Sequence, residues 1–344
     1  MKRRGHGVAG CIYTATVPGA PNPEAANVQM NDDGSVQIQI GGVEIGQGCR
    51  TVICQIAAEA LCIPFEKVRV YNSDTGVTPF DMLTASSRQT FVGGNAVLLA
   101  CEQIKKVLFD STAKKFEVPV EALDIKPGFI YIKDHPEACL PIEVAAILSY
   151  YVFRQLPIGV GQFYPFNTGQ LDENMQGIPC ATYSYQATIA DVEVDTETGV
   201  VDVLKIYTAL DCGRAINPLL LQGQMEGGAI MGLGWALRED SYPLMTRVEG
   251  VHPEFDPATR PTSFADYPIA TAMDIPDIET AIVEVLQEEG PYGAKSAGEI
   301  VHNSAAPAII NAIYNAVGVR IWDLPASPDK ILKGLKEKQQ LEIA

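Results

Sequence analysis

The sequence has few basic side chains: among its 344 residues, 25 Lys and Arg stand against 42 Asp and Glu, a formal net charge of −17. Nucleic acids and anionic membrane surfaces attract concentrated Lys and Arg, so this balance argues against both kinds of partner. No run of about 18 apolar residues occurs that could span a bilayer. Met1-Lys2-Arg3-Arg4 is basic, but the apolar segment of a signal peptide does not follow it. We therefore expect a cytoplasmic protein without a transmembrane helix.

Closely spaced metal ligands are also missing. None of the eight cysteines belongs to a CxxC pair, and none of the four histidines is spaced as part of a ligand pair. Iron–sulfur clusters and zinc sites usually need thiolates or imidazoles at short spacing. The sequence therefore predicts buried, reduced cysteines and no metal ion held by protein side chains alone.

Apolar residues, in contrast, make up 47% of the chain, which is enough to build a folded core. Alternating apolar residues predict hairpins at 27–40 and 187–208, and apolar residues at helical spacing predict a helix at about 50–62. Strands and helices are mixed irregularly, which favours the α+β class. We expect a first α+β subdomain over 1–155, a connecting loop over 156–180 and a second α+β subdomain over 181–344.

The first glycine motif, Gly46-Gln47-Gly48, stands directly before the predicted helix at 50–62. Glycines let a backbone approach a ligand, and a helix start offers free N–H groups and a partial positive charge, so the combination suits an anion. An ordinary turn between a strand and a helix explains a lone motif of this kind even better. No Walker A lysine and no GxGxxG pattern accompanies it.

A second cluster, Thr84-Ala85-Ser86-Ser87-Arg88, places three hydroxyls and a guanidinium at another predicted helix start. Hydroxyls cap helices routinely, which is the simpler interpretation, but an arginine at such a place suits a phosphate. Two helix starts of this kind indicate a phosphate-bearing cofactor that is held at more than one point.

A third motif, Gly298-Glu299, ends a glycine-rich loop that begins at Gly290. A carboxylate on such a loop can approach a substrate or a metal centre, and a buried one can act as a general base. The alternative is a glutamate that interacts favourably with the dipole of the next helix, and composition alone favours that alternative.

Six short stretches stand in a fixed order between residues 40 and 330. They are Gly46-Gln47-Gly48-(x2)-Thr51, Thr84-Ala85-Ser86-Ser87, Asp211-x-Gly213-(x2)-Ile216-Asn217-Pro218, Gly223-Gln224-x-Glu226-Gly227, Gly293-x-Lys295-(x2)-Gly298-Glu299 and Leu324-Pro325-x-Ser327-Pro328. In this order they resemble the molybdenum hydroxylases, the xanthine oxidase family. The resemblance implies the second half of the molybdenum-cofactor-binding unit of that family, with two mixed α/β subdomains.

The resemblance also implies roles for single residues. Glu299 matches the catalytic glutamate, which takes a proton from a hydroxyl ligand of molybdenum. The residues that match cofactor contacts are Gln47, Gly48, Ala85, Ser86, Ser87, Arg88 and Gln224. The implied cofactor is molybdopterin cytosine dinucleotide, whose dithiolene, rather than a protein side chain, holds the molybdenum, with a sulfido or selenido ligand. The implied reaction hydroxylates an electron-poor carbon of a nicotinate-like N-heteroaromatic, with water as the oxygen source.

Two departures from the family shape the expected assembly. The other half of the cofactor-binding unit, including its Gly-Gly-x-Phe-Gly stretch, is not found, so we expect an obligate large molybdopterin subunit. FAD and [2Fe-2S] clusters are expected on further subunits. Ile300 stands where the family usually has proline, which bears on the backbone beyond Glu299 rather than on its carboxylate. Alternatives are a purine or xanthine hydroxylase subunit and a non-catalytic subunit that binds molybdopterin.

Overall fold

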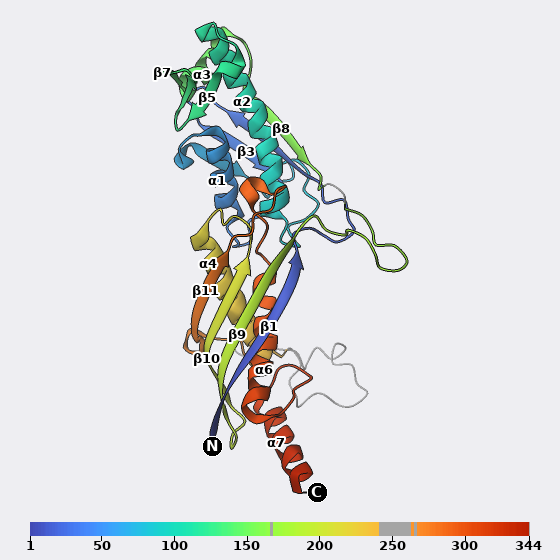
Figure 1. Cartoon of the computed structure of the whole chain (residues 1–344). Coiled ribbons are helices and arrows are strands. Elements are labelled where there is room, and N and C mark those ends of the chain that lie inside the picture. Colours follow the sequence, from blue (N-terminus) through green and yellow to red (C-terminus); the bar gives the residue numbers. More distant parts are fainter. Residues whose placement is uncertain (166–167, 241–262, 265–266, 344) are drawn as a thin grey trace.

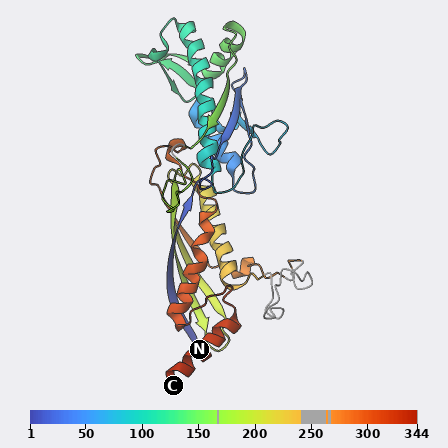
Figure 2. The ribbon, with the colours of Figure 1, turned by 90° about the vertical axis from the view of Figure 1, so that its right-hand side faces the viewer.

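The chain forms two units joined end to end in the computed structural model (Figure 1). Residues 1–165, 168–240, 263–264 and 267–343 are described. Both chain termini lie at the far end of one unit, which we call the lower unit. The other, upper unit is formed by the chain between the first strand and residue 182, and it lies at the opposite end of an elongated molecule (Figures 1 and 2).

A four-stranded sheet in the order β4-β3-β2-β8 forms the base of the upper unit. Its strands are β2 (Glu24–Met30), β3 (Val36–Ile40), β4 (Val68–Tyr71) and β8 (Ile158–Phe163). Every second residue of β2 and β3 is buried, and all of these residues except Glu24 are apolar, because alternate side chains of a strand point to one face. That face packs against α2 (Gly94–Phe116), and α1 (Cys49–Leu61) packs against the same helix.

A smaller three-stranded sheet caps the end of the upper unit. It consists of β5 (Leu123–Lys126), β6 (Phe129–Ile132) and β7 (His135–Pro141), in that order, followed by α3 (Ile142–Ile147). Its buried side chains join the core of the larger sheet. The upper unit therefore has one continuous hydrophobic core.

The lower unit is built on a second four-stranded sheet, in the order β1-β9-β10-β11. Its strands are β1 (Lys2–Thr14), β9 (Tyr183–Asp195), β10 (Val201–Asp211) and β11 (Asp277–Val283). Its helices are α4 (Pro218–Leu237), α5 (Ile300–Asn303), α6 (Ala305–Val317) and α7 (Pro328–Ile343). α4 and α6 lie against the same face of the sheet (Figure 2) and bury its apolar residues.

The boundaries of the units differ from those expected from the sequence. β1 was expected in the first subdomain, but it pairs with β9 of the lower unit along 13 residues. β8 falls in the expected connecting loop, yet it pairs with β2 and completes the upper sheet. Residues 166–167 of that loop lie outside the described residues. The differences arise because pairing between strands distant in the chain leaves no local signal in the sequence.

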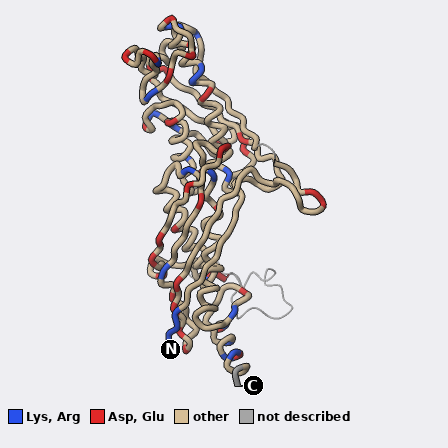
Figure 3. The backbone as a smooth tube through the Cα atoms, in the orientation of Figure 1, with Lys and Arg blue, Asp and Glu red and all other residues tan. Residues whose placement is uncertain are grey.

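Charged residues of both signs are distributed along both units (Figure 3). Basic and acidic positions are interspersed along the described residues, apart from the short basic run Lys2-Arg3-Arg4 at the start of β1. None of the helices within the described ranges is long and apolar enough to cross a membrane.

The packing of β1 on α6 depends on Gly5 and Gly7, where a side chain would collide with the backbone of the helix. A Cβ on Gly7 would lie 2.0 Å from the backbone oxygen of Ala308, whereas a Cβ on Gly10 of the same strand would lie 3.5 Å from Gln186. Gly7→Ala should therefore lower the free energy of unfolding by about 3 kcal/mol, because a helix backbone cannot move aside cheaply. Gly10→Ala is the matched control and should change stability little. Denaturant titration of both variants measures this, and equal stabilities would contradict the packing.

Candidate functional site

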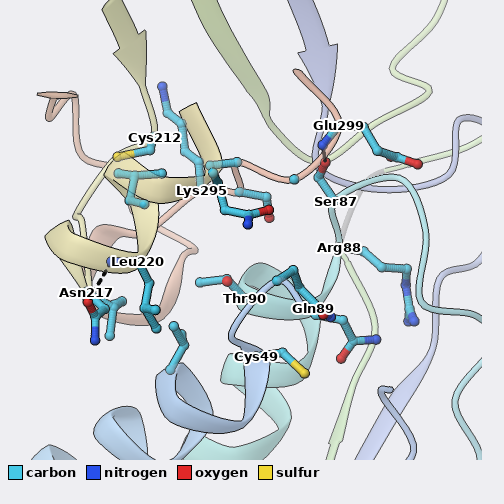
Figure 4. Close-up of a pocket in the computed structure, with 18 of the residues that line it drawn as sticks. Cys49, Ser87, Arg88, Gln89, Thr90, Cys212, Asn217, Leu220, Lys295 and Glu299 are labelled. Carbon is cyan, nitrogen blue, oxygen red and sulfur yellow. Dashed lines mark hydrogen bonds between the residues drawn. The ribbon is translucent and has the colours of Figure 1, made fainter. Parts of the chain in front are cut away.

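A cavity of about 320 Å³ lies where the two units meet (Figure 4). Segments of the upper unit between 45 and 52 and between 84 and 90 line one side of it. Segments of the lower unit between 212 and 231 and between 295 and 302 line the other. Five of the six sequence stretches described above contribute residues to this cavity, although more than 200 residues separate the first from the last.

Most of the residues predicted to bind the cofactor, and the predicted catalytic Glu299, meet at this cavity. Gln47, Ala85, Ser87, Arg88, Gln224 and Glu299 line it, while Gly48 and Ser86 are the neighbours of lining residues in the chain. The sequence motifs therefore converge in space. The contacts of the individual side chains differ from one motif to the next.

The start of α1, which was expected to bind an anion, is held by a carboxylate of the chain itself. Glu44 accepts hydrogen bonds from the backbone N–H groups of Gly46, Gly48 and Arg50, at 2.9, 2.8 and 3.1 Å. Burial opposes ionisation of Glu44, but these backbone donors hold its pKa below the ordinary value. Gly48 has a φ of 86° as the residue before the helix, a conformation that favours glycine. The side-chain amide of Gln47 is also bonded within the turn: its nitrogen donates to the carbonyl of Val43, and its oxygen accepts from the backbone N–H of Ile45.

Arg88 was expected to contact a phosphate, and its guanidinium has partners within the chain. The side chain is fully buried and pairs with Glu24 at 3.2 Å and with Asp81. It also donates to the carbonyl oxygens of Leu83 and Pro23. Figure 4 shows the guanidinium pointing away from the residues grouped around the cavity. The guanidinium is thus held within the chain by Asp81 and Glu24, and a phosphate contact of Arg88 stays a prediction.

The ionisable groups of Arg88, Glu24 and Asp81 influence one another. Burial, together with the neighbouring Asp81, raises the pKa of Glu24 to about 9. Glu24 therefore holds a proton at neutral pH, and Asp81 is the second acidic residue that contacts the guanidinium. Asp81 also accepts hydrogen bonds from Gln89 at 2.9 Å and Thr84 at 3.4 Å. This cluster fixes the segment that leads into α2.

Glu299 lies at the edge of the cavity and is held at both ends. The hydroxyl of Tyr13, on β1, donates to its carboxylate oxygen Oε2 at 2.8 Å. Its backbone N–H donates to the hydroxyl oxygen of Ser87 at 2.7 Å. Burial and the nearby carboxylate raise the pKa of Tyr13 to about 12, so this phenol remains a hydrogen-bond donor throughout the neutral range.

Hydrogen bonds fix the loop that carries Glu299 to the end of β10 and to the start of β9. Lys295 donates from its buried Nζ to Asp211 Oδ2 at 2.5 Å, and its backbone N–H bonds to the carbonyl of Cys212 at 2.8 Å. The hydroxyl of Ser184 donates to the carbonyl of Ser296, also at 2.5 Å. Asp211 and Lys295 belong to two of the sequence stretches, so the motifs mark a structural pair as well as candidate ligands.

Polar atoms that remain free in the cavity suit a neutral, hydrogen-bonding ligand such as a pterin. The hydroxyl of Ser296 is buried without a hydrogen-bond partner, and the amide of Gln224 makes no hydrogen bond to another described residue. The Lys and Arg side chains among the described lining residues are all paired with carboxylates: Arg88 with Glu24 and Asp81, Arg214 with Glu284, and Lys295 with Asp211. Phosphates at this site would therefore meet neutral N–H and hydroxyl donors from this chain.

No group of three or more His, Cys, Asp or Glu side chains in the described ranges is arranged to hold a metal ion.

Comparisons with known proteins place these features in a family. A family model described as molybdopterin cofactor-binding domain matches residues 1–276. The chain is 34% identical over 333 residues to the xanthine dehydrogenase molybdenum-binding subunit of Escherichia coli O157:H7, covering 96% of this chain and 42% of that protein. It is 30% identical over 317 residues to the nicotine 6-hydroxylase large subunit of Paenarthrobacter nicotinovorans, covering 91% of this chain and 37% of that protein.

The fold matches solved structures as well. Quinoline 2-oxidoreductase from Pseudomonas putida 86 superposes with a TM-score of 0.84 at 22% sequence identity, covering 98% of this chain and 42% of that chain. The chain belongs to the molybdopterin cofactor-binding domain family, and a xanthine dehydrogenase molybdenum-binding subunit is among its relatives, so the family predicted from the sequence is confirmed. It spans about two fifths of the length of the relatives it matches.

Several residues of the site were missed at the level of sequence. Tyr13 lies 286 residues from Glu299 and carries no motif of its own. Glu24, Glu44 and Asp81 are ordinary acidic residues in the sequence, and only the fold brings them to the cations and N–H groups they neutralise. The excess of acidic residues in the sequence was the one available signal, but it does not indicate which of them lie at the site.

The proton on Glu24 predicts how stability depends on pH. The folded protein keeps this proton up to about pH 9, while the unfolded chain releases it near the ordinary Glu value. The stabilisation that comes from this proton is therefore fully present below the ordinary Glu pKa, and it is lost as the pH rises toward 9. Glu24→Gln, which remains neutral, should lose less stability than wild type between about pH 6 and pH 9 in urea titrations. The exposed Glu66→Gln should follow wild type; equal slopes in all three proteins would contradict the buried proton.

Proposed function

We propose that this chain is a subunit of a molybdenum hydroxylase, in which Glu299 acts as the catalytic base. The observation that carries the proposal is the meeting of Glu299 with the segments at 45–48 and 84–88 around one cavity. A carboxylate held at the edge of a cofactor cavity is placed to accept a proton from a reacting group. The activity of the longer relatives supports the reaction class.

We propose an electron-poor carbon of an N-heteroaromatic ring as the point of attack. Nicotine, named in the 30% identical relative, contains a pyridine ring. The stretches Gln55-Ile56-Ala57-Ala58-Glu59 and Ser87-Arg88-Gln89-Thr90 also resemble the medium molybdopterin subunit of nicotinate dehydrogenase. The similarity to a xanthine dehydrogenase subunit supports a purine as the second candidate substrate.

In the proposed reaction, this chain positions the proton acceptor. The carboxylate of Glu299 has one oxygen bound by Tyr13, which orients it and leaves further lone pairs to accept a proton. The cofactor, when bound, supplies the redox centre that takes two electrons from the substrate. Ser296 and Gln224 are the side chains with free polar atoms that would bind it. The cytosine dinucleotide form and a sulfido or selenido ligand remain part of the proposal.

A non-catalytic role is the rival interpretation, and Ile300 bears on it. Ile300 is fully buried in a small apolar cluster with Leu210, Met225 and Val301, where it begins α5. The isoleucine therefore has a packing role that leaves the neighbouring carboxylate free. This favours the catalytic interpretation, since the departure from the family pattern is explained by packing.

Glu299→Gln tests the catalytic role. The amide keeps the shape of the side chain but cannot take a proton, so kcat per bound molybdenum should fall by at least about 100-fold. Nicotinate and xanthine with an artificial electron acceptor are the assay substrates, and metal analysis gives the molybdenum content. Glu288→Gln changes an exposed carboxylate of the same segment and should keep wild-type activity. Near-wild-type turnover by Glu299→Gln with cofactor bound would overturn the proposal.

We further propose that a large molybdopterin subunit completes the site, with FAD and [2Fe-2S] clusters on other subunits and the assembly in the cytoplasm. The short span of the chain relative to its relatives supports a missing half. Co-expression with the neighbouring genes should yield a complex that contains molybdenum, whereas the chain expressed alone should bind none. Size-exclusion chromatography with metal analysis measures this. A cofactor-loaded monomer would contradict the expected partner.

A further inference from the structure

One hydrogen bond connects the two units beside Glu299. The backbone N–H of Glu299, in the lower unit, donates to the hydroxyl oxygen of Ser87, in the upper unit, at 2.7 Å. Figure 4 shows the side chain of Ser87 directed at the backbone of Glu299 from across the cavity edge. The bond fixes the backbone of the proposed base relative to the segment at 84–88.

The backbone on both sides is shaped for this contact. Ser87 has a φ of 50° and its neighbour Ser86 a φ of 51°, a left-handed conformation that costs a residue with a side chain of order 1 kcal/mol or more. On the other side, a Cβ at Gly298 would lie 3.1 Å from the Ser87 hydroxyl oxygen. The absence of a side chain at Gly298 thus lets Ser87 reach the N–H of Glu299.

We propose that Ser87 is a positioning residue for Glu299, a role distinct from the cofactor contact that the family resemblance implies. The proposal rests on the proposed function of Glu299. The geometry supports this role because the hydroxyl oxygen of Ser87 accepts a hydrogen bond from the backbone N–H of Glu299. The hydroxyl proton of Ser87 remains free for an acceptor in the cavity. Movement of the two units relative to each other would therefore displace the carboxylate from the reacting group.

The alternative is that the Ser87 hydroxyl only binds the cofactor. In that case, removal of the hydroxyl lowers the amount of cofactor bound but leaves the turnover of each loaded molecule unchanged. Positioning predicts the reverse: turnover per bound molybdenum falls while KM stays constant. A displacement of about 1 Å can cost as much as 100-fold in rate, so a fall of about 10- to 100-fold in kcat is expected.

The variants are Ser87→Ala, Ser87→Gly and Gly298→Ala, prepared in the complete complex. Ser87→Gly keeps the left-handed backbone without strain, so its folding does not depend on the hydroxyl. Ser149→Ala removes a fully buried hydroxyl, which donates within the upper unit to the carbonyl of Ala146, and serves as the control. Each is assayed for kcat and KM with nicotinate and xanthine, for molybdenum content, and for hydrogen exchange at the amide of Glu299.

Positioning makes a further prediction for the double variant. Gly298→Ala should lower kcat in the wild-type background, because the added methyl pushes the Ser87 hydroxyl aside. It should have little further effect on Ser87→Ala, where the nearest remaining atom is the Cβ of residue 87 at 3.6 Å. Such non-additivity identifies the two residues as one contact.

The expected result is a fall in kcat per molybdenum in both Ser87 variants, with unchanged KM, faster exchange at the Glu299 amide, and a non-additive cycle. Wild-type kcat per molybdenum in these variants, or an additive cycle, would overturn the positioning role even if cofactor content fell. Failure of the proposed function is recognised separately, since Glu299→Gln would then retain turnover while the exchange measurement still reported on the Ser87 bond.

Discussion

The antiparallel pairing of β1 with β9 determines where every residue of the site lies. The two strands are neighbours in the lower sheet, yet the whole upper unit is inserted in the chain between them. The chain therefore crosses between the units twice at nearly the same place. The cavity forms at this crossing, with Tyr13 at the end of β1 beside Glu299.

Charge at the cavity follows a pattern: the Lys and Arg side chains among its described lining residues, and the start of α1, each contact an acidic side chain of this chain. Glu44 occupies the start of α1, Asp81 and Glu24 surround Arg88, and Asp211 binds Lys295. These pairs are largely buried, so their value is to fix the geometry of loops rather than to add stability. The pattern explains how an acidic protein can build a cofactor site without surplus positive charge.

The order of the motifs was enough to predict the family, the α+β class and the convergence of 45–48, 84–88 and 299, because those stretches have recognisable composition. Predictions for local elements, such as the hairpin at 27–40, also agree with the structure. The partners of β1, β8 and the Arg88 guanidinium were not predicted for one reason: all of them are distant in the chain. Nothing around Arg88 in the sequence indicates that Glu24, 64 residues away, will share its charge.

The insertion of the upper unit between two paired strands has a consequence for how the chain acquires its structure. β1 is complete after 14 residues but has no partner until residue 183 has joined the chain. Closing so long an unstructured loop would cost substantial entropy, and folding the insertion first brings its two ends together and removes most of that cost. Folding of the upper unit thus brings β1 and β9 together in the lower sheet. A defect in the core of the upper unit would therefore also weaken the pairing of β1 with β9.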